Sequence, residues 1–334
     1  MKIYTIRDIA EMAGVSVTTV SRVLNDRPDV SRETKERVRR VMAKYHFVGN
    51  ANARGLKQAD GESVAIIIRG RNNPFLNTLT EAMLLCPRSE KTAMITEYID
   101  EQDDEFLHAL TLMNRQRIAG LIFLGSRIDE RCKALDGVNV PMVFATVNTQ
   151  GTAMERAASV SMDDRAMVRQ AVETLIRRGH KQIAVFGGRR TGDDSLVLRA
   201  QGAEDALRKH GRELEDDHYV ETRLTMNDAY RKGLEYFRNH PRIDAAFCMS
   251  DTAALGVIRA LADLGKKVPE DVSVMGVDGI EIGRYTTPRL STIVQPVEDI
   301  ARESVAVLTD MLQKHALARH VTVAAKVEIR ESVR

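Results

Sequence analysis

The sequence has few of the features that mark secreted, membrane-spanning or metal-binding proteins. Its three cysteines, Cys86, Cys132 and Cys248, are odd in number and widely spaced, which favours neither a disulfide framework nor a cysteine-based zinc site. No run approaches the roughly eighteen apolar residues of a membrane-spanning helix. The start, MKIYTIRD, lacks the apolar region of a signal peptide. We therefore expect a cytoplasmic protein without a membrane partner.

The chain also lacks recognisable catalytic motifs. It contains no G-x-S-x-G, Walker A or H-E-x-x-H pattern, and G-G-R-R-T-G at 187–192 does not fit a dinucleotide fingerprint. The eight histidines are scattered, and none pairs at metal-ligand spacing. These absences predict no catalytic residues, no cofactor and no metal site.

What the sequence does have is a segregation of charge. Residues 1–58 carry twelve Lys or Arg and six Asp or Glu, a balance of +6, whereas the whole chain is +2, so the remainder carries −4. With 334 residues, 43% hydrophobic residues and eight prolines, the chain suits a globular α/β protein of two or three domains. A basic head on a mildly acidic body is typical of a nucleic-acid-binding module attached to another domain.

The head begins with two short amphipathic helices between Thr5 and Asn25. Thr5 and Ser16 suit helix N-caps, and Gly14 supplies the turn because glycine takes positive φ without strain. Two helices joined in this way predict a helix-turn-helix, whose second helix enters the DNA major groove. A plain αα-hairpin inside a larger domain is the alternative for this stretch alone.

Two further segments complete the head. Ser31 suits the cap of a third helix, about Arg32 to Tyr45, whose many Lys and Arg side chains provide phosphate contacts. The short basic segment Asn50 to Lys57 has one large apolar residue, Leu56, which suits a wedge between base steps in the minor groove. A flexible linker with a single leucine is the alternative.

After this segment the pattern alternates between apolar strands and helices, as in parallel sheets covered by helices. Two successive sets imply two lobes, with ligands beyond the carboxyl ends of the strands, in a cleft between the lobes. The expected strands are 63–68, 93–98, 119–124, 142–146, 182–186, 245–249 and 272–277. The expected helices are 75–85, 104–116, 199–210, 228–239 and 252–264.

Three motifs of the head form a specific pattern: TIRDIAEMAGVSVTTVSRVLN at 5–25, V-S-x-x-T-x-x-R-V at 30–38 and N-x-x-A-x-x-L at 50–56. In these motifs the head resembles the lactose-repressor (LacI/GalR) family. The resemblance implies base contacts from Val17, Thr18 and Arg22, and contacts mainly to the DNA backbone from Thr5, Ser16, Thr19, Ser21, Asn25 and Ser31. It further implies that Asn50, Ala53 and Leu56 belong to a hinge helix that folds on DNA.

Two glycines depart from the family pattern in the hinge segment. Gly49 stands where the family usually has proline, and Gly55 lies inside the segment itself. Both raise the entropy lost on ordering. We therefore expect this hinge to order less readily than in its relatives.

The body resembles the same family through N-P-F at 73–75, R-R-G-H at 177–180, R-A-Q-G at 199–202, S-D-x-x-A-L-G at 250–256, VPEDVSVMGVD at 268–278 and PRLSTI at 288–293. The implied architecture is an all-α helix-turn-helix DNA-binding head at 1–48, a hinge helix at 49–59 and a two-lobed, periplasmic-binding-protein-like α/β domain with parallel sheets at 60–334. The N-lobe would hold 60–162 and 294–320, and the C-lobe 163–293 and 321–334.

The same resemblance implies a set of cleft residues that contact a small-molecule effector: Phe75, Asn148, Asp193, Ser195, Arg199, Ser250, Asp251 and Asp278. Helix or turn capping is an equal interpretation for Asp251. Leu224 stands where many sugar-binding relatives carry an aromatic residue, which weakens the prediction of a hexose ligand.

The hypothesis from sequence is a homodimeric transcriptional repressor that binds a pseudo-palindromic double-stranded DNA operator and responds to a small molecule, with a sugar or sugar derivative favoured. The dimer is expected because no leucine-heptad tail follows the last predicted strand. A regulator that responds to a purine or nucleoside, a solute-binding protein without a regulatory role and a sugar-modifying α/β enzyme are the alternatives.

Overall fold

The computed structural model describes residues 6–24, 30–44, 63–87, 92–154, 156–191 and 195–334. Three helices, α1 (Ile6–Ala13), α2 (Val17–Leu24) and α3 (Arg32–Lys44), form the head. Their common core consists of Ile9, Ala10, Ala13, Val20, Val23 and Val38, all buried. The three-helix head expected from the sequence is therefore confirmed. No helix of the described residues is long and apolar enough to cross a membrane.

The first lobe is built on a parallel six-stranded sheet in the order β11-β5-β4-β3-β1-β2. Its strands are β1 (Ser63–Arg69), β2 (Ala93–Ile99), β3 (Ile118–Leu124), β4 (Met142–Ala145), β5 (Ala157–Ser161) and β11 (His320–Thr322). Its helices are α4 (Pro74–Leu85), α5 (Glu105–Arg115), the 3₁₀ helix η2 (Glu130–Leu135) and α10 (Val297–Gln313).

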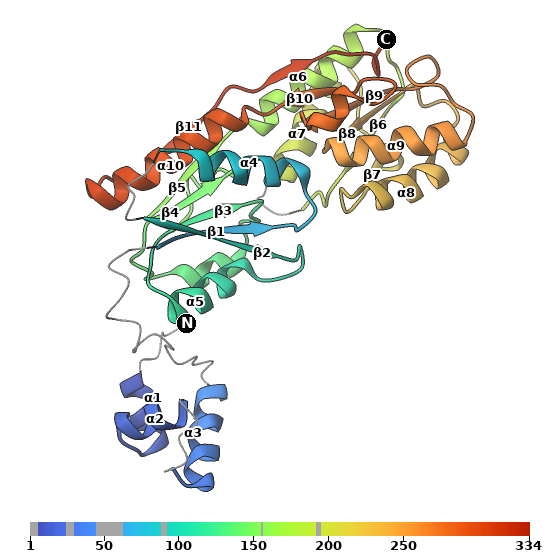
Figure 1. The fold of residues 1–334 in the computed structure, drawn as a ribbon. Helices are drawn as coiled ribbons and strands as arrows, with labels where there is room; N and C mark the ends of the chain where they lie inside the picture. The colour runs from blue at the N-terminus through green and yellow to red at the C-terminus, as the bar shows by residue number, and fades with distance from the viewer. Residues whose placement is uncertain (1–5, 25–29, 45–62, 88–91, 155, 192–194) are drawn as a thin grey trace.

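The second lobe has a six-stranded sheet in the order β12-β10-β9-β8-β6-β7, parallel except for β12. Its strands are β6 (Ile183–Gly187), β7 (Tyr219–Glu221), β8 (Ala245–Cys248), β9 (Ser273–Asp278), β10 (Ser291–Val294) and β12 (Lys326–Glu328). Its helices are α6 (Asp164–Arg177), α7 (Ser195–Lys209), α8 (Met226–Asn239), α9 (Asp251–Asp263) and the 3₁₀ helices η3 (Asp216–His218) and η4 (Glu281–Arg284). Figure 1 shows the two lobes side by side.

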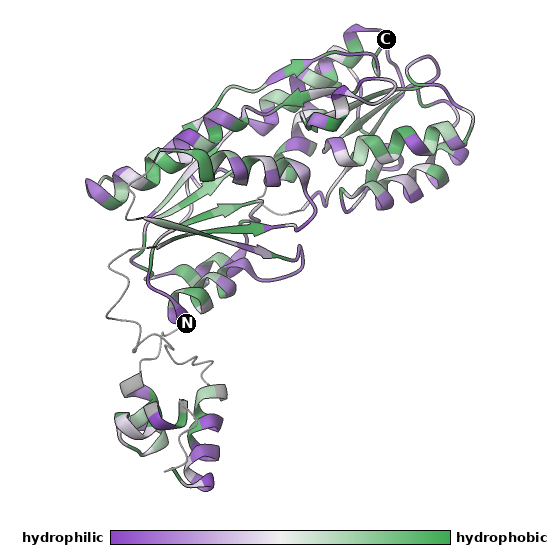
Figure 2. Ribbon diagram, viewed as in Figure 1, coloured by the Kyte–Doolittle hydropathy of each residue, from purple (hydrophilic) through white to green (hydrophobic). Residues whose placement is uncertain are grey.

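Alternation along the strands explains why each sheet is covered on both faces. Successive strand residues point to opposite faces, so a strand buried on both sides is apolar throughout. In β1, Ile66 and Ile68 pack with α4 and α10, whereas Ala65 and Ile67 pack with α5. The hydropathy colouring shows apolar strands inside the lobes and polar outer helix faces (Figure 2).

The chain crosses between the lobes three times, and the third crossing falls later than expected. The sequence placed 321–334 in the C-lobe. In the structure, His320–Thr322 pair in parallel with Ser159–Ser161 of the first sheet, and only β12 joins the second. The alternating run HVTVAAKVEIR looks like one strand, but Val323 still donates its amide to the carbonyl of Ser161 at 2.9 Å. The boundary between the two lobes therefore lies after Val323. Residues before it pair with the edge strand of the first sheet, and residues after it pair with the edge strand of the second.

Most other elements lie within two residues of their expected limits, and α7 is the main exception, since it begins at Ser195 rather than Arg199. In the middle of this helix Gly202 allows a close approach to α6. A Cβ atom at Gly202 would collide with the carbonyl oxygen of Arg165 and would lie 3.1 Å from the amide nitrogen of Arg169.

We predict that Gly202→Ala lowers the free energy of unfolding by about 1–3 kcal/mol, because the two helix backbones must separate to admit the methyl group. Urea unfolding of the full chain measures this. Arg208→Ala, an exposed change on the same helix, should stay within about 0.5 kcal/mol of the parent. Equal stability of the two variants would contradict the close packing of α6 and α7.

Candidate DNA-binding head and effector cleft

The turn between α1 and α2 has the local chemistry expected of a helix-turn-helix. Gly14 has φ +64°. Ser16 caps α2, because its Oγ accepts a hydrogen bond from the amide of Thr19 at 3.1 Å. Ser31 caps α3 in the same way, with 3.3 Å to the amide of Thr34. The hydroxyls of Ser16 and Thr19 also lie 2.8 Å apart.

The second helix has one buried and one exposed side. Val20 and Val23 are buried, whereas Val17, Thr18 and Arg22 are exposed, with Val17 at 40%. An exposed valine beside a threonine and an arginine is unusual for a solvated surface, but it suits contact with thymine methyl groups and base edges. The three residues that the family resemblance assigns to base contacts therefore lie on one exposed side of α2.

Several expected residues cannot be placed in this way. Thr5, Asn25, Asn50, Ala53, Leu56 and Asp193, together with the side chain of Ser21, lie outside the described residues.

A pocket of about 210 Å³ lies where the first lobe's strand ends meet the second lobe. It is lined by Val147, Asn148, Met162, Asp163, Asp164, Ser195, Leu198 and Thr322. Asn148 and Ser195, 47 positions apart in the sequence, are brought together as expected. Asp163 and Asp164 were not anticipated. Their place in the sequence could have indicated this role, because both residues directly follow the chain's first crossing between the lobes.

Backbone strain marks the same region. Thr146 follows β4 with φ +79°, and Asp278 ends β9 with φ +120°. Both are non-glycine residues in the left-handed region, which costs about 1–3 kcal/mol each and persists only where the surrounding structure enforces it. Each lies at the carboxyl end of a parallel strand, where ligands of α/β sheets bind.

Arg199 belongs to a buried charge network behind the pocket. Its Nε donates to Asp164 Oδ1 at 2.7 Å and its Nη1 to the carbonyl of Met249 at 2.7 Å. Asp278 Oδ1 accepts from Gln295 Nε2 at 2.8 Å. Burial raises the pKa of Asp278 to about 6, against the opposing charge of Arg199. Arg199 is thus not among the described lining residues, whereas its partner Asp164 lines the pocket.

The remaining expected residues have structural contacts in the described part of the chain and do not line the pocket. Phe75 is 5% exposed and belongs to the core of the first lobe. Ser250 caps α9 by accepting from the amide of Ala253 at 3.1 Å. Asp251 Oδ2 accepts from the amides of Gly279 and Ile280 at 2.8 and 2.9 Å, and Oδ1 accepts from the hydroxyl of Thr292 at 2.6 Å. Ser250, and not Asp251, therefore caps α9, and the contacts of Asp251 join the start of α9 to the loop after β9 and to β10.

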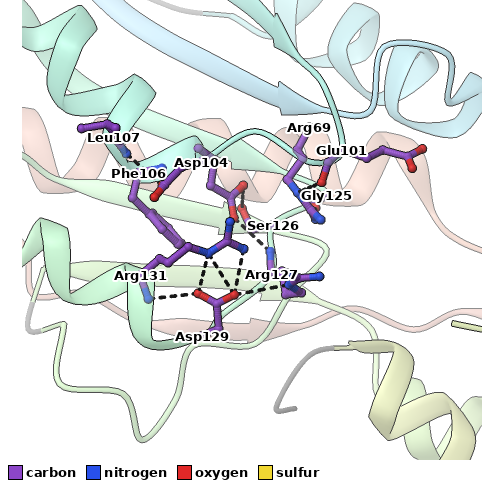
Figure 3. Close-up of polar contacts among 11 residues, drawn as sticks. Arg69, Glu101, Asp104, Phe106, Leu107, Gly125, Ser126, Arg127, Asp129 and Arg131 are labelled. Carbon is purple, nitrogen blue, oxygen red and sulfur yellow. Dashed lines mark hydrogen bonds and ion pairs between the residues drawn. The ribbon is translucent and has the colours of Figure 1, made fainter. Parts of the chain in front are cut away.

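A second polar cluster lies at the strand ends of the first lobe (Figure 3). Glu105, 1% exposed, accepts from the hydroxyl of Ser126 and the amide of Arg127, both at 3.0 Å. Burial raises the pKa of Glu105. Arg69 donates to the carbonyls of Glu101 and Gly125 at 3.1 and 3.0 Å. This cluster ties β1 and β3 to α5.

Its remaining members pair with one another. Hydrogen bonds from Arg131, at 2.8 Å for the shortest, lower the pKa of Asp129 to about 2. Arg127 donates to the same carboxylate at 3.3 Å. The guanidinium groups of Arg69, Arg127 and Arg131 thus lie in one cluster with the carboxylates of Glu105 and Asp129, and their contacts join the strand ends of the first lobe.

The buried carboxyls predict a pH dependence of stability. Burial raises the pKa of Asp251 to about 8, and the charge of Asp278 adds to the rise. An acid whose pKa is higher in the folded state stabilises the protein fully below its unfolded pKa, and this contribution is lost as pH rises through the folded values.

We predict that the free energy of unfolding falls from pH 5 to pH 9 by at least about 1 kcal/mol, since each pKa unit corresponds to about 1.4 kcal/mol. Asp278→Asn should reduce this dependence. Asp263→Asn, which removes a carboxyl whose pKa is lowered by its bond to Tyr230, should leave it unchanged. Urea titrations at each pH measure the free energy of unfolding. If Asp278→Asn and the parent show the same dependence on pH, the buried carboxyl of Asp278 is not its source.

Comparison with known proteins agrees with this architecture. Residues 5–50 match the bacterial regulatory proteins of the lacI family, and residues 172–333 match a periplasmic binding protein-like domain. The chain is 30% identical to the HTH-type transcriptional regulator MalR of Clostridium butyricum over 333 residues, 98% of each chain. It is 29% identical to catabolite control protein A of Priestia megaterium over 332 residues, 99% of each chain.

Solved structures of transcriptional regulators have the same fold. The chain superimposes on the transcriptional regulator CelR in complex with cellobiose with a TM-score of 0.74 and 26% identity, covering 99% of this chain and 100% of that one. It matches the fold of the lac repressor dimer bound to operator and the anti-inducer ONPF with a TM-score of 0.70 and 24% identity, covering 99% of each. The chain belongs to the LacI family of bacterial transcriptional regulators, a family of non-enzymes.

Proposed function

We propose that this protein is a cytoplasmic, homodimeric transcriptional repressor that binds a pseudo-palindromic operator and is controlled by a small molecule in the interlobe pocket. Members of the LacI family bind operator DNA and small effectors such as sugars, typically as dimers. The observation that carries the proposal is the exposed side of α2, with Val17, Thr18 and Arg22, on a chain whose two lobes meet at a polar pocket.

In this proposal the head provides specificity through α2 and affinity through α3. Arg37, Arg39 and Arg40 are exposed on α3 and suit phosphate contacts, which carry little sequence information. Asn50, Ala53 and Leu56 are assigned to the hinge by family resemblance, with Leu56 as the minor-groove wedge. Two-fold symmetry of the dimer requires two operator half-sites related by the same symmetry.

The pocket lining favours an uncharged, hydroxyl-rich effector. The lining side chains of the described residues include two carboxylates, an amide and two hydroxyls but no cation. A phosphorylated ligand would therefore meet like charge, whereas carboxylates and amides accept and donate hydrogen bonds to sugar hydroxyls. The lining also offers no aromatic face for a purine. A neutral sugar or polyol is thus the proposed effector class.

Ligand binding would act on DNA binding through the geometry of the lobes. The pocket contacts Asn148 on the first lobe and Ser195 on the second, so a bound ligand stabilises one relative arrangement of the two. If DNA also prefers one arrangement, the two affinities are coupled reciprocally. The direction of this coupling distinguishes an inducer from a co-repressor.

Arg22→Ala should reduce both operator affinity and the preference for operator over random DNA, since a lost base contact costs about 1–3 kcal/mol at one position. Fluorescence anisotropy with an operator selected by the parent protein measures both quantities. Arg37→Ala removes the same charge from α3 and should weaken binding to both DNAs equally. An unchanged preference in Arg22→Ala would exclude readout by this residue.

Saturation with the effector at about one hundred times its dissociation constant should stabilise the full chain by about 2.7 kcal/mol. A thermal-shift screen of neutral sugars, polyols, sugar phosphates, nucleosides and purines is expected to give hits among the first two groups. Asn148→Ala should weaken a hit, whereas Gln150→Ala, an exposed neighbour outside the lining, should not. A purine as the sole hit would contradict the proposed effector class.

A further inference from the structure

The second lobe carries a strongly basic pocket that is separate from the effector cleft. Its volume is about 280 Å³. It is lined by four cationic residues and one carboxylate: Arg284, Arg289, Lys326, Glu328 and Arg330. None of these residues lines the interlobe pocket.

The edge strand β12 explains how three of these side chains come together. β12 pairs antiparallel with β10 at the edge of the second sheet. Val327 and Ile329 pack against the core of the second lobe. Because side chains alternate along an extended strand, residues 326, 328 and 330 lie on the opposite side. Arg284 at the end of η4 and Arg289 before β10 complete the pocket.

Arg330 is the buried member. Its side chain is only 9% exposed. Its Nη1 donates to the carbonyl of Leu290 at 2.8 Å, and its Nε donates to Glu328 Oε1 at 3.3 Å. Its Nη2 is shielded from solvent and has no acceptor among the described residues. A buried donor without an acceptor costs about 1–3 kcal/mol, and more for a charged group.

The charges around Arg330 do not balance. Glu328 is the one carboxylate of the lining, and it already accepts from Arg330. Arg289 pairs with Glu331 at 2.9 Å. Arg284 and Lys326 are exposed and form no ion pair within the described part of the chain. The hydrogen bond from Arg330 lowers the pKa of Glu328, and Lys326 and Arg284 contribute to this shift. The pocket thus has an excess of positive charge.

We propose that this pocket binds the phosphoryl group of a small molecule, either inorganic phosphate or a small phosphomonoester. A phosphoryl oxygen would give Arg330 Nη2 its missing acceptor, and guanidinium groups match phosphate geometry with paired N–H donors. The dianion offsets more of the excess charge than a monocarboxylate does. The site is chemically opposite to the interlobe pocket, whose lining carries two carboxylates.

Isothermal titration of the full chain with inorganic phosphate and, separately, with glycerol 3-phosphate tests the proposal, with sodium chloride matching the ionic strength. We expect saturable binding of one phosphoryl group per chain. The double variant Arg284→Gln/Lys326→Gln changes two exposed side chains and should weaken binding at least tenfold. Tighter binding of the ester would identify an organic phosphate as the ligand, and tighter binding of inorganic phosphate would identify free phosphate. Equal binding would show that the site recognises the phosphoryl group alone.

The matched control is Arg242→Gln/Lys267→Gln, which removes two exposed cations from the same lobe outside the pocket. It should bind phosphate within about twofold of the parent, because distant surface charges are screened by salt. Equal weakening in both double variants, or no saturable binding by the parent, would overturn the proposal. The proposal would also fail if Arg284→Gln/Lys326→Gln changed the oligomeric mass but left the phosphate affinity unchanged. That result would assign these cations to contacts between copies of the chain.

Discussion

One buried carboxylate joins three elements of the second lobe close to its contact with the first. Asp251, at the start of α9, accepts the amides of Gly279 and Ile280 and the hydroxyl of Thr292, so it ties α9 to the loop after β9 and to β10. Ile280 in turn belongs to the core of the first lobe. The contact requires glycine at Gly276, because a Cβ there would collide with Asp251 Oδ1.

The two pockets differ in the charge they present, although both depend on arginine. In the interlobe pocket, Arg199 donates to Asp164, and the described lining presents the carboxylate and not the cation. On the edge of the second lobe, Arg330 pairs with the one carboxylate of the lining, and three further cations leave the pocket basic. Since the environment of a charged side chain decides what it offers a ligand, arginine in the sequence does not by itself indicate an anionic effector.

The head differs from the body because its structure depends on contacts between residues that are close in the sequence. Ser16 and Ser31 cap the helices that they precede, and Val20, Val23 and Val38 close the core at helical spacing. These contacts span few residues, so each helix is specified by its own caps and periodicity. Val17, Thr18 and Arg22 lie on the exposed side of α2, opposite the residues that form this core.

The sequence by itself predicted the three-helix head and two lobes built on parallel sheets, with seven strands and five helices of the body, because caps and apolar periodicity act within short windows. The expected segments did not include α6, α10, β5, β7 and β10. Family resemblance predicted Asn148 and Ser195 as cleft residues, and both line the interlobe pocket. Only the tertiary structure decided that Asp251 joins α9 to the loop after β9 and to β10, that Phe75 belongs to a core and that Asp164, which pairs with Arg199, lines the pocket. It also decided the strand boundary near Thr322. Burial and charge pairing join residues far apart in the chain, and no local pattern records which partner a side chain meets.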